Sequence, residues 1–268
     1  MLNTDTFGQG PNLTLLHGWA AQNSDWKNWA ETELAPFFTV TLIELPGFGN
    51  SDALPDSKHI EADWIAAITA ELPEKTHLLG WSLGGLLAQK IAKQSPERIQ
   101  SLICLASTPR FIQADDWKWA VSPTLIADFI QAIGTDTAAT LKHFWKLQIQ
   151  GSDGARKLIK EFMSKIKDSR LPSIKGLLQG LELLKSIDCR PCAQDIKCPV
   201  LWLLGENDPL IPVHFIQDFM TEFSTIQPIA KVEILSGAAH MPFISHPSET
   251  AEQIIVFLQD QSPLLQST

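Results

Sequence analysis

Several features that define other classes of protein are missing from this sequence. No apolar run reaches the roughly 18 residues that a membrane-spanning helix needs. The 21 basic residues are outnumbered by 30 acidic ones, and the net charge of −9 argues against a general nucleic-acid-binding protein. Residues 1–10 are polar and have neither the basic nor the apolar region of a signal peptide, so we expect a cytoplasmic protein that does not associate with membranes.

Cysteine is scarce, and its four positions do not suggest a metal site. Cys189 and Cys192 fit the pattern C-x-x-C, with Cys198 nearby and Cys104 in a distant apolar run. A zinc site needs a fourth ligand at suitable spacing, which is not evident here. A thioredoxin-type pair opens a helix, whereas this pair precedes a strand-like run. We therefore expect reduced structural thiols and no metal or other cofactor.

The most informative stretch that is present is Gly-Trp-Ser-Leu-Gly-Gly at residues 80–85. It joins an apolar run, residues 76–79, to a helix-like run, residues 86–94. Strand, tight turn and helix form a nucleophile elbow, in which the serine hydroxyl stands clear of the backbone. The flanking glycines permit close approach of the strand and the helix. Ser82 is the predicted nucleophile, and the amide N–H of Leu83 is predicted to face a developing oxyanion.

Strand-like apolar runs alternate with helix-like runs over most of the chain. Strands are predicted at residues 13–16, 39–45, 76–79, 99–105, 200–204 and 231–235, and helices at 25–33, 60–72, 86–94, 213–223 and 247–259. This alternation predicts an α/β fold with a doubly wound, mostly parallel sheet. Residues 110–186 contain only helix-like runs, so we predict a helical lid there, inserted into a core formed by residues 1–109 and 187–268.

Ser82, Asp208 and His240 each follow a predicted strand, in the chain order nucleophile, acid, base. The carboxyl ends of parallel strands lie at one edge of the sheet, so we expect these residues to meet there. Serine needs a base to take its proton, histidine can accept and return that proton, and a carboxylate fixes the imidazole. Glu206 and His246 are nearby alternatives. We favour Asp208, which lies in a G-x-x-D-P-x-x-P turn, and His240, because His246 begins the last helix.

His17-Gly18-Trp19 follows the first predicted strand. In a serine hydrolase the loop after this strand supplies the second amide of the oxyanion hole, so the N–H of Trp19 is the candidate donor. We expect its indole to line the acyl pocket, although a core aromatic is the simpler interpretation. His17 is expected to be structural.

These motifs resemble the α/β-hydrolase superfamily over almost the whole chain and, within it, the BioH family of biotin-pathway carboxylesterases. The resemblance lies in residues 17–19, 44–51, 80–85, 144–148 and 239–247. It implies a serine carboxylesterase that hydrolyses the methyl ester of pimeloyl-acyl-carrier protein through an acyl-enzyme. It also implies substrate contacts at Trp19, Ser82, Leu83, Phe144, Trp145, Lys146, Leu147, Gln148 and His240.

Three other functions remain open: a broad short-chain carboxylesterase, a C–C bond hydrolase with the same triad, and a non-catalytic ligand receptor. Serine at the elbow argues against epoxide hydrolases and haloalkane dehalogenases, which use aspartate there. The sequence has no tyrosine, which removes the lid tyrosines of the epoxide hydrolases that it resembles.

Positive charge is concentrated in one part of the predicted lid. Residues 142–175 contain nine basic and three acidic residues, a net charge of +6, whereas the other 12 basic and 27 acidic residues give −15. If the charge lay in a single helix, a face exposed to solvent would be enough to explain it. With the family resemblance, however, it predicts that the lid binds an acidic carrier protein, with Arg156, Lys157 and Lys160 as the contacts. We expect the enzyme to be a monomer.

Overall fold

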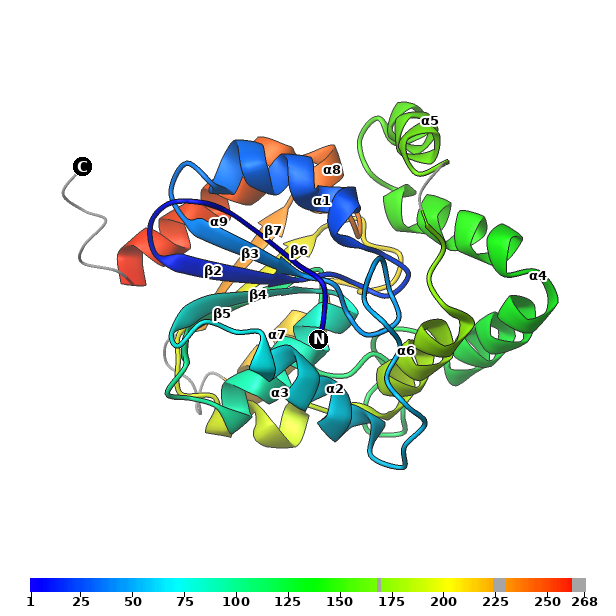
Figure 1. Ribbon diagram of the computed structural model, residues 1–268, viewed down its shortest axis with the longest axis horizontal. Coiled ribbons are helices and arrows are strands. Elements are labelled where there is room, and N and C mark those ends of the chain that lie inside the picture. The colour runs from blue at the N-terminus through cyan, green and yellow to red at the C-terminus, as the bar shows by residue number, and fades with distance from the viewer. Residues whose placement is uncertain (168–169, 224–229, 262–268) are drawn as a thin grey trace.

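Figure 1 shows the computed structural model, which describes residues 1–167, 170–223 and 230–261. A twisted sheet runs through the body of the molecule, with helices on both faces, and a group of helices covers one end. This arrangement confirms the predicted doubly wound α/β fold. The last residues of the predicted core, 262–268, lie outside the described residues.

The sheet has seven strands in the order β1-β3-β2-β4-β5-β6-β7. Its strands are β1 (Thr4–Gly8), β2 (Asn12–Leu16), β3 (Thr39–Ile43), β4 (Thr76–Trp81), β5 (Ile99–Leu105), β6 (Val200–Gly205) and β7 (Ala230–Leu235). All neighbouring strands are parallel except β1, which is antiparallel to β3. Every residue of β4 and β6 is buried, as expected for strands covered by helices on both faces.

The antiparallel strand β1 was not predicted from the sequence. Its residues alternate between exposed and half-buried, and its sequence, TDTFG, has a single large apolar side chain. Phe7 pairs with Val40 in the register that places β1 at the edge of the sheet. Short, polar edge strands are common because they limit edge-to-edge association, and their pattern is weak in the sequence.

Helices cover both faces of the sheet and one end of the molecule. They are α1 (Asn23–Trp29), η1 (Ala30–Leu34), α2 (Ile60–Ala70), α3 (Leu83–Gln94), α4 (Pro123–Ile149), α5 (Ala155–Lys165), α6 (Ile174–Ser186), η2 (Arg190–Asp195), α7 (Phe215–Phe223), α8 (Pro242–Ser245) and α9 (Pro247–Gln261). In Figure 1, α1, α8 and α9 lie on one face of the sheet, and α2, α3 and α7 lie on the other. None of the helices in the described part of the chain is long and apolar enough to cross a membrane.

The helices α4, α5 and α6 all fall within the predicted lid at residues 110–186, and we call them the lid. The first of them, α4, is a single long helix with one break. The backbone leaves helical geometry at Asp136, with φ −150° and ψ 90°, and the helix bends there. The Asp136 carboxylate accepts a hydrogen bond from the amide of Ala139 at 2.9 Å, so it caps the second half. Asp168, one of the three acidic residues in the charge count above, lies outside the described residues.

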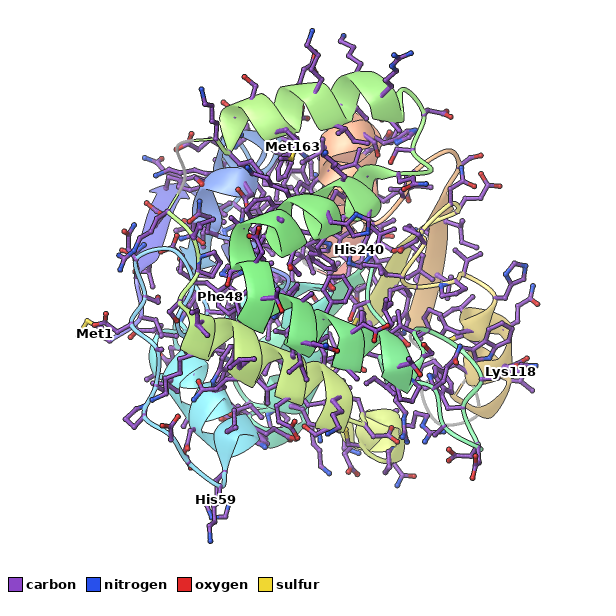
Figure 2. All side chains as sticks on the ribbon, turned by 90° about the vertical axis from the view of Figure 1, so that its right-hand side faces the viewer. Met1, Phe48, His59, Lys118, Met163 and His240 are labelled. Carbon is purple, nitrogen blue, oxygen red and sulfur yellow. The ribbon has the colours of Figure 1, made fainter. Side chains whose placement is uncertain are left out.

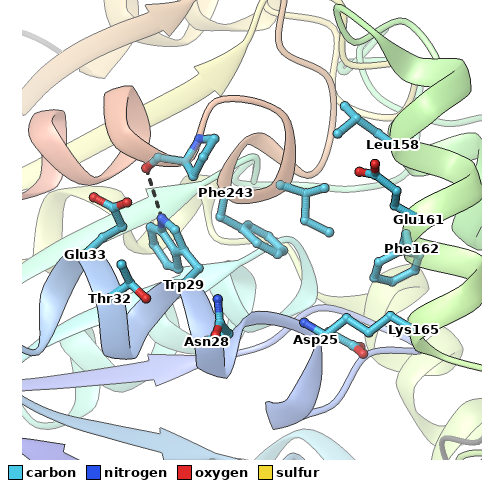
Figure 3. Close-up of a pocket in the computed structure, with 12 residues that line it drawn as sticks. Asp25, Asn28, Trp29, Thr32, Glu33, Leu158, Glu161, Phe162, Lys165 and Phe243 are labelled. Atoms are coloured by element: carbon cyan, nitrogen blue, oxygen red, sulfur yellow. Dashed lines mark hydrogen bonds between the residues drawn. The ribbon is translucent and has the colours of Figure 1, made fainter.

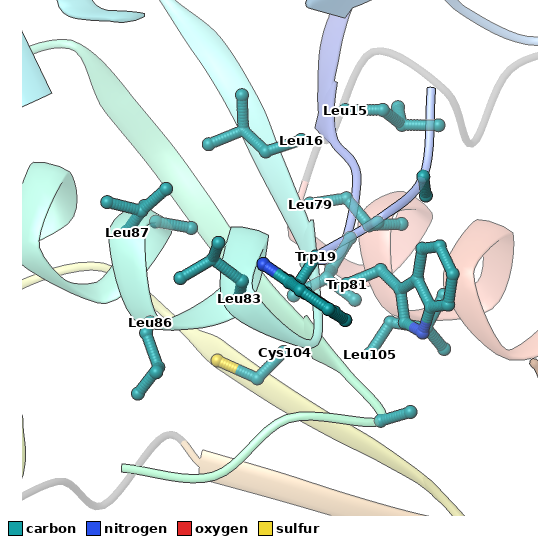
Figure 4. Packing of buried hydrophobic residues seen from close by; sticks show 14 of the residues in the cluster. Leu15, Leu16, Trp19, Leu79, Trp81, Leu83, Leu86, Leu87, Cys104 and Leu105 are labelled. Carbon is teal, nitrogen blue, oxygen red and sulfur yellow. The ribbon is translucent and has the colours of Figure 1, made fainter. Parts of the chain in front are cut away.

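Buried apolar side chains surround the start of α3, as Figure 4 shows. Leu79 of β4, Leu83 and Leu87 of α3, and Leu105 of β5 are all completely buried. Burying one such leucine contributes about 2 kcal/mol. The turn that carries Ser82 is therefore held between a strand and a helix that are both anchored in the core.

Candidate active site

Ser82 occupies a strained turn between β4 and α3. Its φ of 55° and ψ of −117° lie in a region that non-glycine residues rarely adopt. A side chain at Gly80 would come within 2.2 Å of the carbonyl oxygen of Gly84, and one at Gly84 within 2.1 Å of that of Leu16. These contacts explain why the elbow needs glycine on both sides of the serine.

The structure brings Ser82, His240 and Asp208 together, although they lie far apart in the sequence. His240 Nε2 is 2.9 Å from Ser82 Oγ, and His240 Nδ1 is 2.7 Å from Asp208 Oδ2. The other carboxylate oxygen of Asp208 accepts hydrogen bonds from the amides of Leu210 and Ile211 at 2.8 and 3.0 Å. All three side chains are buried, with His240 completely so, and Figure 2 shows His240 behind α4. The carboxylate is thus fixed, and it can hold the imidazole with Nε2 directed at the serine hydroxyl.

The two alternative residues have other partners. The Glu206 carboxylate accepts hydrogen bonds from the hydroxyl of Ser236 and the amide of Gly237, which lower its pKa, and it is exposed. His246 Nδ1 is 2.9 Å from the hydroxyl of Ser245, at the start of α9. Neither Glu206 nor His246 has a hydrogen bond to a triad residue among the described parts of the chain.

The loop after β2 lies directly against Ser82. A side chain at Gly18 would come within 3.1 Å of the Ser82 Cβ. Among the described residues, no hydrogen bond is made by the amide N–H of Trp19 or by that of Leu83, so both donors are available to a ligand. The positions of these amides, beside the serine and at the start of α3, fit an oxyanion hole.

His17 fixes this loop from behind. Its Nε2 accepts a hydrogen bond from the amide of Leu45 at 3.0 Å, so the proton resides on Nδ1, which donates to the carbonyl of Gly18 at 2.8 Å. Complete burial lowers the pKa of His17 to about 4, so the ring is neutral at pH 7. This geometry fits the expected structural role.

Contacts between the lid and the loop that carries His240 were not predicted. The His240 amide donates to the carbonyl of Gln148 at 3.1 Å, and the Ala239 amide donates to the hydroxyl of Ser152 at 3.2 Å. Trp81, the residue before the nucleophile, donates its indole N–H to the carbonyl of His240 at 2.8 Å. The backbone of His240 is thus held both from the core and from the end of α4. These contacts use backbone atoms and a small hydroxyl, which leave little signal in a sequence.

The sequence-predicted substrate residues of α4 divide between two sides of the helix. Phe144 is buried and packs edge-on against the Trp19 indole, with ring centroids 4.8 Å apart. Gln148 is buried too, and its side-chain Nε2 has no hydrogen-bond partner among the described residues. The indole N–H of Trp145 donates to the carbonyl of Ala20 at 2.8 Å, which ties α4 to the loop after β2.

Lys146 and Leu147 differ from the others in that segment. Lys146 is exposed and lines a cavity with Lys142 and Met163 that contains no triad residue, and its expected contact with the substrate stays a prediction. Leu147 is half-buried and lines a separate apolar cavity with Phe129. A helix presents residues 100° apart, so five consecutive residues cannot all face one site.

A cavity of about 360 Å³ separates α5 from α1 and α8, as Figure 3 shows. Its lining includes Asp25 and Trp29 from the core and Phe162 and Lys165 from the lid, but none of the triad residues. In Figure 3 the Lys165 side chain extends across the cavity toward Asp25. This cavity is distinct from the site of Ser82, Asp208 and His240, although it lies under the same helix, α5, as the predicted docking residues.

Those docking residues lie on the outer face of α5. Arg156, Lys157 and Lys160 are all exposed. Lys157 is 3.8 Å from Glu161, while Arg156 and Lys160 have no ion pair among the described residues. Figure 2 shows nitrogen-tipped side chains projecting from α5 into solvent. The positive charge of this helix is therefore available to a partner.

A serine on a strand–helix elbow, with histidine and aspartate on later loops of the same sheet edge, is typical of a serine hydrolase. The sequence matches the family described as the alpha/beta hydrolase fold over residues 11–247. The chain belongs to this family and, within it, to the family of the pimeloyl-[acyl-carrier protein] methyl ester esterases.

Two curated relatives and two solved structures define these similarities. The esterase of that name from Aeromonas salmonicida is 36% identical over 258 residues, which cover 96% of this chain and 99% of the relative. The one from Pseudoalteromonas atlantica is 34% identical, over 92% of this chain and 94% of the relative. An esterase from Exiguobacterium antarcticum has a TM-score of 0.82 at 21% identity, covering 96% of this chain and 95% of its own. A bromoperoxidase from Bacillus anthracis has a TM-score of 0.82 at 20% identity, covering 97% and 95%. At these identities the solved structures show the fold alone.

Proposed function

We propose that this protein is a serine carboxylesterase that hydrolyses the methyl ester of pimeloyl-acyl-carrier protein, giving pimeloyl-acyl-carrier protein and methanol. The observation that carries the chemistry is the hydrogen-bonded series Ser82, His240 and Asp208, with distances of 2.9 and 2.7 Å. The choice of substrate comes from the curated relatives, whose printed name states this activity. We place the reaction in the cytoplasm. We also expect a monomer to be sufficient, because Ser82, Asp208 and His240 come from one chain.

In the proposed reaction Ser82 Oγ attacks the carbonyl carbon of the methyl ester, while His240 Nε2 takes the hydroxyl proton. Asp208 stabilises the imidazolium that forms and keeps its Nδ1–H directed at the carboxylate. The tetrahedral intermediate collapses, His240 returns the proton to the leaving methoxide, and methanol departs. Water then attacks the acyl-enzyme with His240 again as the base, which releases the free carboxylate and restores the serine.

The amides of Trp19 and Leu83 form the proposed oxyanion hole. Negative charge develops on the carbonyl oxygen during attack, and two fixed N–H donors stabilise it without reorganising. Leu83 is the first residue of α3, so the helix dipole adds a favourable potential at the same point. Loss of one such donor typically lowers kcat by about 100-fold or more.

For the acyl chain we propose contacts with the indole of Trp19 and the ring of Phe144, which lie edge to face. Gln148 supplies a polar contact, because its buried Nε2 has no partner and an unpaired buried donor is unfavourable. Trp145 supports the pocket through its hydrogen bond to Ala20 and need not contact the substrate.

The carrier protein is proposed to dock on the exposed face of α5 through Arg156, Lys157 and Lys160. The rest of the enzyme is acidic, so this face gives an acidic partner a defined place of attraction. Electrostatic steering of this kind raises the association rate and decreases with salt. The lid therefore both positions the catalytic base and binds the carrier in this proposal.

The experiment that tests the chemistry measures hydrolysis by Ser82→Ala with methyl pimeloyl-acyl-carrier protein and with a p-nitrophenyl ester. We expect kcat to fall on the order of 10⁴-fold or more on both substrates. Ser186→Ala, at an exposed serine on α6, is the matched control and should remain fully active. More than a tenth of the wild-type rate in Ser82→Ala would rule out the proposed nucleophile.

Carrier recognition is tested by comparing carrier-bound methyl pimelate with the free methyl ester, in the wild type and in Arg156→Glu/Lys160→Glu. We expect the double variant to lose about tenfold in kcat/KM on the carrier substrate, together with most of the salt dependence. Its rate on the free ester should be unchanged. Lys75→Glu/Lys197→Glu, with the same charge change at exposed positions just before β4 and β6, should behave as wild type. Equal kcat/KM on the carrier-bound and free esters would instead identify a broad short-chain esterase.

A further inference from the structure

The turn that carries Cys189 and Cys192 lies where the chain returns from the lid to the core. The Cys189 amide donates to the carbonyl of Pro109 at 2.7 Å, and the neighbouring Asp188 is paired with Arg110 at 2.8 Å. These contacts join the two chain segments that enter and leave the lid. The catalytic mechanism uses neither cysteine.

Both thiols lie on a single 3₁₀ turn, η2 and its first flanking residue. The amide of Cys192 donates to the carbonyl of Cys189 at 3.1 Å. This i to i+3 hydrogen bond brings the two Cα atoms within about 7 Å, the range in which a disulfide can form. The sequence alone predicted no helical turn here, which is why the pair was interpreted as structural thiols.

Both thiols have hydrogen-bond partners. As a thiol, Cys192 donates to the carbonyl of Cys189 at 3.1 Å, and Cys189 donates to the carbonyl of Leu86 at 3.6 Å. As a thiolate, Cys192 accepts the proton of Cys189 instead, and this hydrogen bond lowers the pKa of Cys192 to about 7. The nearby ammonium groups of Lys90 and Lys93 lower it further, although each is also paired with a carboxylate, Glu61 and Asp195 respectively. Burial has the opposite effect on Cys189, whose pKa lies well above the usual value.

The two cysteines are therefore chemically unequal, as a nucleophilic and a resolving thiol need to be. We propose that Cys189 and Cys192 form a peroxide-sensitive dithiol, which oxidises to an intramolecular disulfide at the junction of the lid and the core. Cys192 is the attacking residue and Cys189 the resolving one. Cys192 is only 4% exposed, which favours an oxidant close to water in size, and hydrogen peroxide meets this condition.

The reaction takes two steps. The Cys192 thiolate attacks one oxygen of hydrogen peroxide, and the O–O bond breaks. The hydroxide that leaves takes up the proton that the Cys192 thiol had released, which gives water. The sulfenic acid on Cys192 is then attacked by the sulfur of Cys189. The S–S bond forms, and the hydroxyl departs as water with the Cys189 proton. Two thiols are oxidised by two electrons in total, and one peroxide is reduced to two waters.

Oxidation also changes a contact near the nucleophile. A disulfide sulfur has no proton, so the carbonyl of Leu86 loses its hydrogen bond from Cys189. The amide of Leu86 is in turn hydrogen-bonded to the carbonyl of Ser82 at 3.3 Å. The dithiol therefore lies two hydrogen bonds from the catalytic turn.

The test treats the folded wild-type enzyme with a small excess of hydrogen peroxide, removes the peroxide, and alkylates the remaining thiols after unfolding. Trypsin does not cleave between Arg190 and Pro191, so both cysteines remain in one peptide, residues 186–197. We expect this peptide to become about 2 Da lighter, unalkylated, and sensitive to dithiothreitol. Cys104 and Cys198 lie in separate tryptic peptides and serve as internal controls that should stay alkylated.

Three variants test the assigned roles. Cys189→Ser should stop the reaction at the sulfenic acid of Cys192, which dimedone traps, and Cys192→Ser should leave Cys189 reduced. In Lys93→Met, which keeps both cysteines, oxidation of the dithiol should require a higher pH than in the wild type. The substitution removes a cation that favours the Cys192 thiolate. The proposal fails if peptide 186–197 keeps two alkylatable thiols, or if Cys198 oxidises as fast as the pair does.

Discussion

Asp25 allows a direct test of how a buried carboxyl group changes the stability of this protein with pH. It lies in the first turn of α1, is only 8% exposed, and lines the cavity beneath α5. Burial raises the pKa of its carboxyl group to about 7, despite the opposing effects of the Gln22 amide, which donates to it at 3.0 Å, and of Lys165. Substituting Asp25→Asn keeps the shape and the acceptor oxygen but removes the charge.

The magnitude follows from proton linkage. An aspartate with a pKa of 3.8 in the unfolded chain and about 7 in the folded one binds its proton more tightly when folded. That preference contributes about 4 kcal/mol to the free energy of unfolding below the unfolded pKa, and this contribution is lost as the pH rises through 7. The asparagine variant has no such loss. The free energy of unfolding of the variant should therefore equal that of the wild type at pH 4 and exceed it by about 4 kcal/mol at pH 8.

Two buried histidines act in the opposite direction, which is why the difference between variant and wild type is the useful quantity. Burial lowers the pKa of His17 and of His77 to about 4. Each contributes stability that is present above the unfolded pKa of 6.5 and is lost as the pH falls toward 4, by about 3 kcal/mol. These contributions are the same in both proteins and cancel in the comparison.

The assay is urea unfolding at several pH values from 4 to 8, followed by the fluorescence of the nine tryptophans. Asp63→Asn, at an exposed position in the first turn of α2, is the matched control and should show no growing difference. A constant difference between Asp25→Asn and wild type at every pH would refute the reasoning. So would a variant that is less stable than wild type at pH 8.

Two further predictions concern the catalytic turn and its acid. Gly84→Ala should abolish most ester hydrolysis, because the new Cβ would lie 2.1 Å from a carbonyl oxygen. The control is Gly134→Ala, at a position on α4 with open space around it. It should keep full activity and gain about 1 kcal/mol of stability. Activity in Gly84→Ala close to wild type would contradict this. Asp208→Asn should lower kcat on the order of 10⁴-fold, while Glu206→Gln should have little effect, and the reverse order would show that the acid is misassigned.

Much of the fold was predictable because its signals are local. The parallel strands are short apolar runs, and Ser82, Asp208 and His240 each lie in the segment that follows one, so the topology alone brings them to one edge. Strand β1 was missed because its pairing with β3 depends on contacts far along the chain and not on its own pattern. The exposure of Lys146 could not be predicted, because the family resemblance covers consecutive residues, whereas a helix turns them to different sides.

The lid contacts of the catalytic loop show why the remainder of the site needs coordinates. The carbonyl of Gln148 and the hydroxyl of Ser152 hold the backbone of Ala239 and His240, and the Asp153 amide donates to the carbonyl of Gly237 at 2.8 Å. Any residue can supply a backbone carbonyl or amide, so no sequence pattern marks these positions. Because the end of α4 holds the backbone of His240, the proposed base, we expect deletion of the lid to impair the proposed proton transfer as well as the proposed carrier binding. Substitutions on the outer face of α5 leave these hydrogen bonds in place, so they can separate the proposed recognition of the carrier from the chemistry.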